Sequence, residues 1–407
     1  MFCRLCLLLG TSLAFSPLWA GAAERNASGA TAFNPKISLI LNSLYGHYSV
    51  DSTVPADVGG VLPGGESGFA PAGFSLGETE MVVESNIDDQ FHGWATISMA
   101  PGGAISVEEA FVNTLALPAG LAVKLGRFKS EIGYQNHIHA HAWEFVDAPI
   151  VYRALLGTQL QDDGVQLRWV APTDLLVEIG AEALRGDAYP AGGDPKGGFN
   201  NATGFIHLGG DAGDGGSWRV GLSHLRAKAN GRVTGEGITT LFTGNSDVSG
   251  ADLVFKWAPN GNPANTNFVF NAEYFYRKEA GALVYDPDSA DPTNTGPIPS
   301  AYDGKQQGYY AQAIYQFMPR WRAGVRYDWL HSANNVGTPA PGTSLATLAD
   351  NSYDPKRYSV MADFSNSEFS RVRLQYNRDE SRPAKVKDNQ FFVQFIYSLG
   401  AHPAHSF

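Results

Sequence analysis

The sequence predicts an all-β fold, a closed antiparallel transmembrane β-barrel of about 16 strands. Segments of roughly ten residues alternate apolar with polar side chains, as strands with one face in lipid do. Composition agrees, because 46 glycines and 12% aromatic residues accompany only 17% charged residues, and the mean hydropathy is −0.17. After the N-terminus, no apolar run reaches the roughly 18 residues of a membrane-spanning helix. Lipid cannot hydrogen-bond an open sheet edge, so such strands must close into a barrel.

The N-terminal residues 1–22 are predicted to be a secretory signal peptide. Arg4 supplies the positive charge, residues 5–15 form an apolar core, and residues 20–22 form a small-residue cleavage site. Both cysteines, Cys3 and Cys6, lie in the part that would be removed. Residues 23–35 are then a short periplasmic segment, and residues 36–407 are the barrel in the outer membrane of a Gram-negative cell.

Short and long connections alternate along the barrel region, which predicts its topology. If the first strand, residues 36–49, rises from the periplasm, the connections divide into about eight outer ones and about seven periplasmic turns. Both termini are then periplasmic. The third outer connection, residues 130–157, is rich in histidine, tryptophan and acidic residues. Residues 230–247 and 279–305 are also predicted to be outer loops.

Polar positions of the strands predict two charged walls in the lumen. The acidic wall is expected on the second and seventh strands, and the basic wall on the last strands; the residues are Glu78, Glu80, Glu84, Glu178 and Glu182, and Arg322, Arg326, Arg357, Arg371 and Arg373. Opposed walls would set up a transverse field that orients solutes and sorts ions. Alternatively, inward charges only hydrate the lumen and pair across strands. Glu109, on an otherwise apolar face, indicates a break in the alternation such as a β-bulge.

Over essentially all of its mature length the chain resembles the bacterial outer-membrane porin superfamily. Five stretches, residues 73–80, 107–111, 141–149, 162–169 and 400–407, are similar to a proteobacterial group labelled zinc-regulated TonB-dependent outer-membrane receptors. Receptors of the TonB-dependent class have about 22 strands and a plug domain, as that label would imply. About sixteen strands and the short segment 23–35 favour an unplugged, porin-like channel instead.

The porin resemblance implies that the third loop, residues 130–157, folds into the barrel and narrows the pore. Glu131, Glu144 and Asp147 would then face the arginines across the constriction. The resemblance also implies a homotrimer. The barrel-assembly machinery is expected to recognise the terminal aromatic residue Phe407. Outer-membrane lipid and lipopolysaccharide are expected to surround the barrel.

Three histidines of that loop, His137, His139 and His141, form a run with alternate spacing. In extended backbone the imidazoles would lie about 7 Å apart on one side, too far for one metal ion unless the loop bends. Imidazole suits zinc, copper or nickel, and Glu144 or Asp147 could add an oxygen ligand. The alternative is that these histidines only line the pore, with no cofactor.

The function predicted from these patterns is passive diffusion of small hydrophilic or charged solutes through the lumen. A metal-binding or metal-uptake receptor that uses the histidine loop is the alternative. A barrel hydrolase is the third possibility, but no motif demands a catalytic triad, so we expect no enzyme activity. The formal net charge of −11 argues against nucleic-acid partners.

Overall fold

The computed structural model describes residues 35–51, 57–65, 67–100, 102–194, 197–234, 239–286, 298–337, 348 and 352–400. The predicted signal peptide 1–22, nearly all of segment 23–35, and Phe407 lie outside the described residues. No helix among the described residues is long and apolar enough to cross a membrane.

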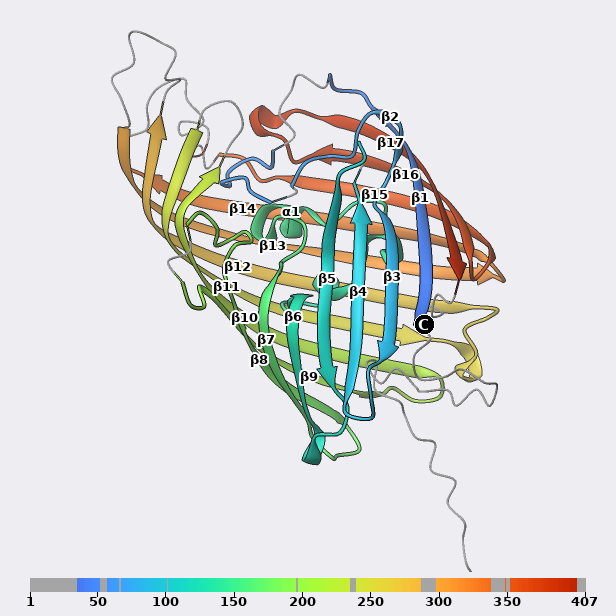
Figure 1. Ribbon diagram of the computed structural model, residues 1–407. Helices are drawn as coiled ribbons and strands as arrows, with labels where there is room; N and C mark the ends of the chain where they lie inside the picture. The colour runs from blue at the N-terminus through green and yellow to red at the C-terminus, as the bar shows by residue number, and fades with distance from the viewer. Residues whose placement is uncertain are drawn as a thin grey trace, which may run out of the picture.

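The described chain forms one closed antiparallel sheet (Figure 1), in which β1 pairs with β17 to close the ring. Its strands are β1 Lys36–Tyr48, β2 Gly73–Leu76, β3 Thr79–Asn86, β4 Phe91–Met99, β5 Ile105–Thr114, β6 Leu121–Lys129, β7 Gln161–Val170, β8 Leu176–Leu184, β9 Asn201–Asp211, β10 Gly216–Thr234, β11 Thr239–Trp257, β12 Asn267–Asp286, β13 Ile298–Met318, β14 Trp321–Val336, β15 Lys356–Ser367, β16 Ser370–Glu380 and β17 Asp388–Gly400.

Strands β2 and β3 are two halves of one membrane-crossing segment, because both pair with β1. The break falls at Gly77 and Glu78. A Cβ atom at Gly77 would lie 2.6 Å from the Asn42 side-chain amide, so a larger residue at this position would displace the Asn42 side chain. Counting the two halves as one confirms the predicted sixteen-stranded barrel.

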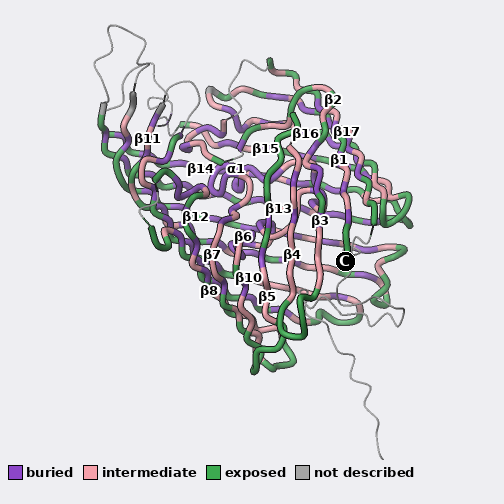
Figure 2. The backbone as a smooth tube through the Cα atoms, in the orientation of Figure 1, coloured by how far each residue is buried: buried purple, intermediate pink, exposed green. Residues whose placement is uncertain are grey.

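Exposed and more buried residues alternate along the strands (Figure 2), as expected when one face meets lipid and the other meets the lumen. On β14, Trp321 and Val325 are exposed on the outer face, while Arg326 and Asp328 are buried on the inner face. On β16, Leu374 is exposed between the buried Arg373 and Gln375. Strand residues have a period of two, so one face can be apolar while the other carries charge.

Several strands are longer than the sequence analysis predicts. Strands β10 to β13 have 19, 19, 20 and 21 residues, whereas about 9–11 residues suffice to cross a bilayer. The predicted outer loops 230–247 and 279–305 are therefore largely strand, and this correction leaves the count unchanged. The backbone pairing of β11 with β12 continues without a break from Trp257 and Phe268 to Thr239 and Asp286. The parts of these strands that extend beyond the membrane carry polar side chains, as an outer loop does. The sequence pattern alone therefore misplaced the strand boundaries.

The barrel is not hollow, because the connection between β6 and β7 lies inside it. This connection contains the short helices η2 Gln135–His137, η3 Ala140–Ala142 and α1 Ile150–Leu156. Figure 1 shows α1 within the ring of strands. Buried residues of α1, such as Tyr152 and Leu155, form one apolar cluster with inward side chains of the wall, among them Phe275, Tyr310 and Leu330. The remaining short helices, η1 Pro118–Gly120, η4 Pro259–Gly261 and η5 Pro383–Lys385, lie in connections between strands.

Residues 57–65, which lie between β1 and β2, also turn into the mouth of the barrel. Gly59 donates its backbone N–H to the carbonyl of Ser381, and Asn334 of β14 donates to the carbonyl of Gly60. Leu62 packs in a second apolar cluster with Phe242 and Tyr302. The sequence analysis did not foresee this inward loop, because its glycine-rich composition carries no signal of direction.

Candidate functional site

The third loop begins at a neck that its own side chains close. Ser130 donates its backbone N–H to the carbonyl of Leu160, on the other side of the neck. The amide of Asn136 donates to the carbonyls of both residues and accepts the N–H of Leu160. Asn136 is fully buried. Both the nitrogen and the oxygen of the Asn136 amide are therefore hydrogen-bonded to the two ends of the loop. These bonds hold the two ends together where the loop leaves the barrel wall.

Wall carboxylates far away in the sequence hold the backbone of the loop across the lumen. Glu273 of β12 accepts the N–H groups of Tyr134 and Gln135 at 2.7 and 2.9 Å. Asp328 of β14 accepts the N–H of Ile150 at 2.8 Å. Charged acceptors make the stronger class of hydrogen bond, and all these groups lie away from bulk water. The residues predicted to narrow the pore therefore lie inside it.

Asp147 is the most heavily bonded carboxylate of the loop. Its oxygens lie 2.7 Å from Arg326 and 2.6 Å from Arg357, and they accept hydrogen bonds from Gln375 and Asn377. Burial alone would raise the pKa of Asp147, but the two guanidinium groups outweigh it and hold the pKa well below its usual range. We name Asp147 and these four partners, Arg326, Arg357, Gln375 and Asn377, the Asp147 anchor.

The arginines of the predicted basic wall lie on the inner face of the strands, but most of them are paired with carboxylates. Arg322 pairs with Glu144 at 2.9 Å and with Asp363 at 2.7 Å, and Arg373 lies 3.3 Å from the same Asp363. Arg371 instead donates to the carbonyl of His141. The alternation placed Asp328 on the inner face with Arg322 and Arg326, but the sequence analysis missed the inward carboxylates Asp363 and Asp379, although even spacing from the arginines on the same strands put them on that face as well.

The predicted acidic wall is likewise compensated locally. Glu178 lies 3.2 Å from Arg168 and 3.0 Å from His207, and Glu84 lies 3.4 Å from Lys36. Glu182 accepts hydrogen bonds from the hydroxyl of Ser130, the N–H of Glu131 and the amide of Gln166. Glu78 lies at the break between β2 and β3 and lines the outer part of the lumen. The lumen therefore contains local pairs of opposite charge rather than the predicted transverse field between an acidic and a basic wall.

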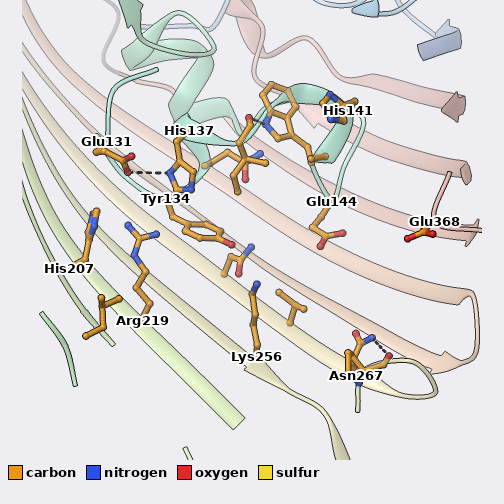
Figure 3. A pocket seen from close by; sticks show the side chains of 18 of the residues that line it. Glu131, Tyr134, His137, His141, Glu144, His207, Arg219, Lys256, Asn267 and Glu368 are labelled. Atoms are coloured by element: carbon orange, nitrogen blue, oxygen red, sulfur yellow. Dashed lines mark hydrogen bonds and ion pairs between the residues drawn. The ribbon is translucent and has the colours of Figure 1, made fainter. Parts of the chain in front are cut away.

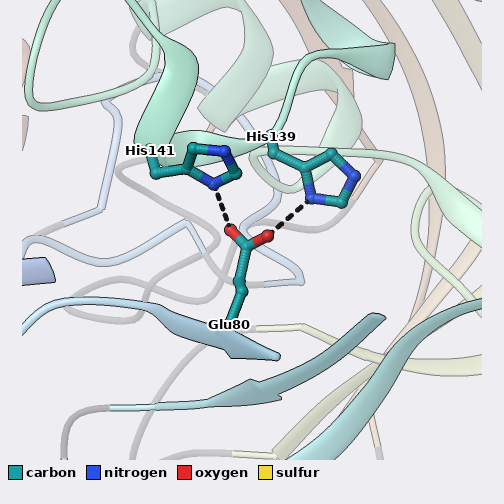
Figure 4. Close-up of side chains that lie close together, drawn as sticks. All are labelled: Glu80, His139 and His141. Carbon is teal, nitrogen blue, oxygen red and sulfur yellow. Dashed lines mark hydrogen bonds and ion pairs between the residues drawn. The ribbon is translucent and has the colours of Figure 1, made fainter. Parts of the chain in front are cut away.

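The three loop histidines do not converge, which corrects the predicted metal site. His139 and His141 both approach Glu80 of β3 (Figure 4), with Nδ1 to oxygen distances of 3.0 and 2.8 Å. His137 lies elsewhere, 3.5 Å from Glu131. The helical turns η2 and η3 rotate successive histidines away from the common side that an extended backbone would give them.

Carboxylates and one lysine surround His139. Its Nε2 lies 2.9 Å from Glu109, and its Nδ1 lies 3.5 Å from Glu108 as well as close to Glu80. Lys129 lies 2.6 Å from Glu108. A register shift in β5 makes two consecutive residues, Glu108 and Glu109, both buried, as the misplaced Glu109 led us to expect. We name these residues, with Glu80 and His141, the histidine cluster.

The surroundings move the pKa values of His137 and His139 in opposite directions. Burial lowers the pKa of His137 to about 4, although Glu131 opposes the shift. Burial and Lys129 also disfavour charge on His139, but Glu80, Glu108 and Glu109 outweigh them and raise its pKa well above the usual value. The carboxylates of the histidine cluster therefore attract positive charge to His139.

The loop lines two large cavities of the lumen. The inner one, of about 1340 Å³, is lined by Tyr134, Arg219 and Lys256 among others (Figure 3). The outer one, of about 640 Å³, includes Glu108 and Tyr189. Trp143 lines both, and its indole N–H donates to the carbonyl of Ile138 at 2.7 Å. The Trp143 ring therefore stands where the two cavities adjoin.

A sequence relative establishes a family for this chain. No family model matches the sequence. A protein of Aquifex aeolicus (strain VF5), described only as uncharacterized, is 31% identical over 419 residues, covering 95% of this chain and 83% of the relative. The chain belongs to the family of this Aquifex protein. The relative's description states no activity, so function must be argued from the lumen.

Solved structures show the same architecture. A loop L8 deletion mutant of OmpT, an outer-membrane protein of Vibrio cholerae, matches with a TM-score of 0.56 and 12% identity over 91% of this chain and 100% of that chain. The outer-membrane channel DcaP of Acinetobacter baumannii matches at 0.52 and 15%, over 90% and 96%. An anion-selective porin of Comamonas acidovorans matches at 0.51 and 10%, over 90% and 99%. At these identities the likeness concerns the fold, and the fold is that of the outer-membrane porins.

Proposed function

We propose that this protein is an outer-membrane channel through which small hydrophilic solutes diffuse passively, with a preference for anions. The observation that carries the proposal is the inner cavity of about 1340 Å³, which has ten charged side chains in its lining and adjoins the outer cavity at Trp143. A porin barrel with a charged constriction sorts solutes by size and charge without a catalytic step. We therefore also propose that the protein is not an enzyme.

The preference for anions follows from the charges that line the inner cavity. Six cationic side chains line it against four carboxylates; they are Arg168, Arg219, Lys256, Arg320, Arg322 and Arg371, and Glu131, Glu144, Glu178 and Glu368. Within the part of the chain that the structure describes, neither Arg219 nor Arg371 forms a salt bridge. Excess positive charge between low-dielectric walls raises the local concentration of anions.

Bilayer recording tests the proposal directly. The refolded full chain should produce discrete conductance steps in a planar bilayer, and a salt gradient should give a reversal potential of the sign for anion flow. A protein that inserts but never conducts would refute the channel. A conducting pore that prefers cations would refute the charge argument while leaving the channel intact.

A double variant, Arg219→Gln with Arg371→Gln, separates charge from size. We expect the anion preference to fall or reverse, because the cavity loses two guanidinium groups that form no salt bridge among the described residues. The matched control is Arg226→Gln, a side chain that is 65% exposed on the outer face of β10. Equal reversal potentials for both variants would contradict the role of the cavity charges.

We further propose that the protein assembles as a homotrimer in the outer membrane. Support comes from one structural neighbour, OmpT of Vibrio cholerae, which is described in a trimer form. The mass of the detergent-solubilised protein, measured by light scattering, tests this proposal. A monomer mass under conditions in which the barrel remains folded would refute it.

A further inference from the structure

The geometry points to a divalent metal site of the zinc type at the histidine cluster, with Glu80, His139 and His141 as ligands. These residues join the third loop to β3, one from the wall and two from the loop (Figure 4). The inference goes beyond the proposed channel and does not depend on which solute passes. It also replaces the ligand set expected from the sequence, since His137 is absent from it and Glu80 takes its place.

Distances between the candidate ligand atoms fit one small ion. Bonds from Zn²⁺ to imidazole nitrogen and carboxylate oxygen are about 2.0–2.2 Å, so neighbouring ligand atoms of a tetrahedral site lie about 3.3–3.6 Å apart. Here the nitrogen to oxygen distances are 3.0 and 2.8 Å, and one ligand atom from each of the three residues lies within 4.8 Å of the others. The two short distances run to different oxygens of Glu80, and separations up to 4.8 Å exceed the tetrahedral spacing, so the loop side chains would have to close by about an ångström around the ion.

Three buried polar atoms at this point make no hydrogen bond. They are Nδ1 of His139, Oε2 of Glu80 and Oε2 of Glu108. Glu80 is 0% exposed and Glu108 is 4% exposed, so solvent hardly reaches these oxygens. The Nδ1 atom lies 3.0 Å from the first oxygen and 3.5 Å from the second, as in ion pairs to a protonated imidazole. Buried polar groups are rarely left this way, and atoms that converge without bonding one another are what a shared ion requires.

Charge balance gives a second and independent reason. Three carboxylates, those of Glu80, Glu108 and Glu109, face one ammonium group, that of Lys129, which leaves two negative charges when both imidazoles are neutral. Glu78 and Lys124, which act on this group from the adjoining wall, cancel each other. Uncompensated buried charge is costly. A divalent cation would bring the cluster to neutrality.

Glu109 supplies the outer-sphere contact that metal-binding histidines usually have. Its Oε2 lies 2.9 Å from Nε2 of His139, on the ring edge opposite the Nδ1 that faces Glu80. Such a carboxylate fixes the ring orientation and the tautomer, and it makes the ligand nitrogen more basic. The backbone N–H of Lys129 donates to the other oxygen of Glu109 at 3.0 Å, so this carboxylate is itself held in place.

Calorimetric titration of the refolded, chelator-treated full chain with ZnCl₂ tests the site. We expect one ion per chain, and an affinity at least tenfold lower for His139→Ala/His141→Ala and for Glu80→Gln. Glu80→Gln keeps the shape of the side chain, so it reports ligation even if the double alanine variant folds poorly. The matched control, His137→Ala, removes a histidine of the same loop that lies outside the cluster and should bind as the wild type does.

Cobalt provides a readout that does not depend on affinity. Co²⁺ in a tetrahedral site should give intense visible d–d bands in the wild type and in His137→Ala, and these bands should be lost in Glu80→Gln. Absence of zinc binding in the wild type would show that the cluster holds protons alone and would overturn the inference. Binding that survives equally in His139→Ala/His141→Ala would assign the ion to other residues and would also overturn it. Neither result bears on conductance, so the channel proposal is tested separately.

Discussion

The Asp147 anchor and the histidine cluster attach the same loop to two different parts of the barrel wall, and they differ in charge balance. At the anchor, Asp147 and Asp328 each face both Arg326 and Arg357. Arg357 also lies 3.9 Å from Asp379, and Arg153 adds a third positive charge whose field acts on this region. Three carboxylates thus meet three guanidinium groups.

At the histidine cluster, three carboxylates meet one ammonium group and two imidazoles. The first attachment is complete as it stands, whereas the second needs protons or a cation to become neutral. Strength of attachment and capacity to bind an ion are therefore placed in separate regions of one loop. A loop held at a balanced anchor can carry an unbalanced cluster without leaving the lumen.

The largest expected loss of stability comes from a substitution in the Asp147 anchor. Asp147→Asn leaves Arg326 and Arg357 buried with one carboxylate fewer, and removing one partner of a buried ion pair typically costs about 3–5 kcal/mol. We expect a loss of unfolding free energy of that order and a larger single-channel conductance, because the loop loses its main attachment. Denaturant unfolding and bilayer recording measure the two. Unchanged values for both would show that the anchor does not hold the loop.

A smaller loss of unfolding free energy is expected from the equivalent substitution in the histidine cluster. Glu80→Gln, measured in chelator, removes one charge from a cluster that has an excess of negative charge and keeps an oxygen that can accept from His141. The expected cost is about 1 kcal/mol, that of one hydrogen bond. A cost equal to that of Asp147→Asn would erase the distinction between the two regions.

A still smaller effect is expected for Glu144→Gln, which serves as the control for Asp147→Asn. The pair between Glu144 and Arg322 is partly accessible, with side-chain exposures of 20% and 18%, and Arg322 keeps Asp363 as a partner. Partly exposed pairs contribute about 0–1 kcal/mol. A destabilisation that matches that of Asp147→Asn would mean that any charge lost from the loop has the same effect, wherever it lies.

The smallest effect concerns pH. The pKa of Asp147 is held below its usual value by Arg357 and Arg326 against burial, so its contribution to stability is complete above the unfolded pKa of about 3.9 and is lost as pH falls further. We expect the stability difference between wild type and Asp147→Asn to stay constant from pH 7 to pH 5. It should shrink only below about pH 4. A difference that already declines near pH 6 would contradict a depressed pKa.

Much of the barrel could be predicted from the sequence because strand alternation is a local property. Arg322, Arg326 and Arg373 were placed on the inner face from the parity of their positions alone, and the structure has them there. Their partners were not foreseen in full. Asp363 shares the inner face of β15, but its pairing with Arg322 depends on the register between β14 and β15, which the alternation does not specify.

The loop shows the limit of local reasoning most clearly. The spacing of His137, His139 and His141 suggested one site, but two short helical turns divide them, and the remaining ligand candidate comes from β3. His141 and Glu80 are separated by 61 residues, and Asp147 and Arg357 by 210. No pattern within a window of ten residues can report such contacts.

The sequence by itself determined a closed porin-like barrel of sixteen strands, because a period of two with one apolar face leaves a chain in lipid no other way to satisfy its backbone. Only the tertiary structure decided that the first and third connections turn inward, that the arginines of β14 to β16 are mostly neutralised, and that His139 and His141 meet Glu80. Those outcomes depend on the path of a loop through the lumen, where residues far apart in sequence compete for the same buried charges.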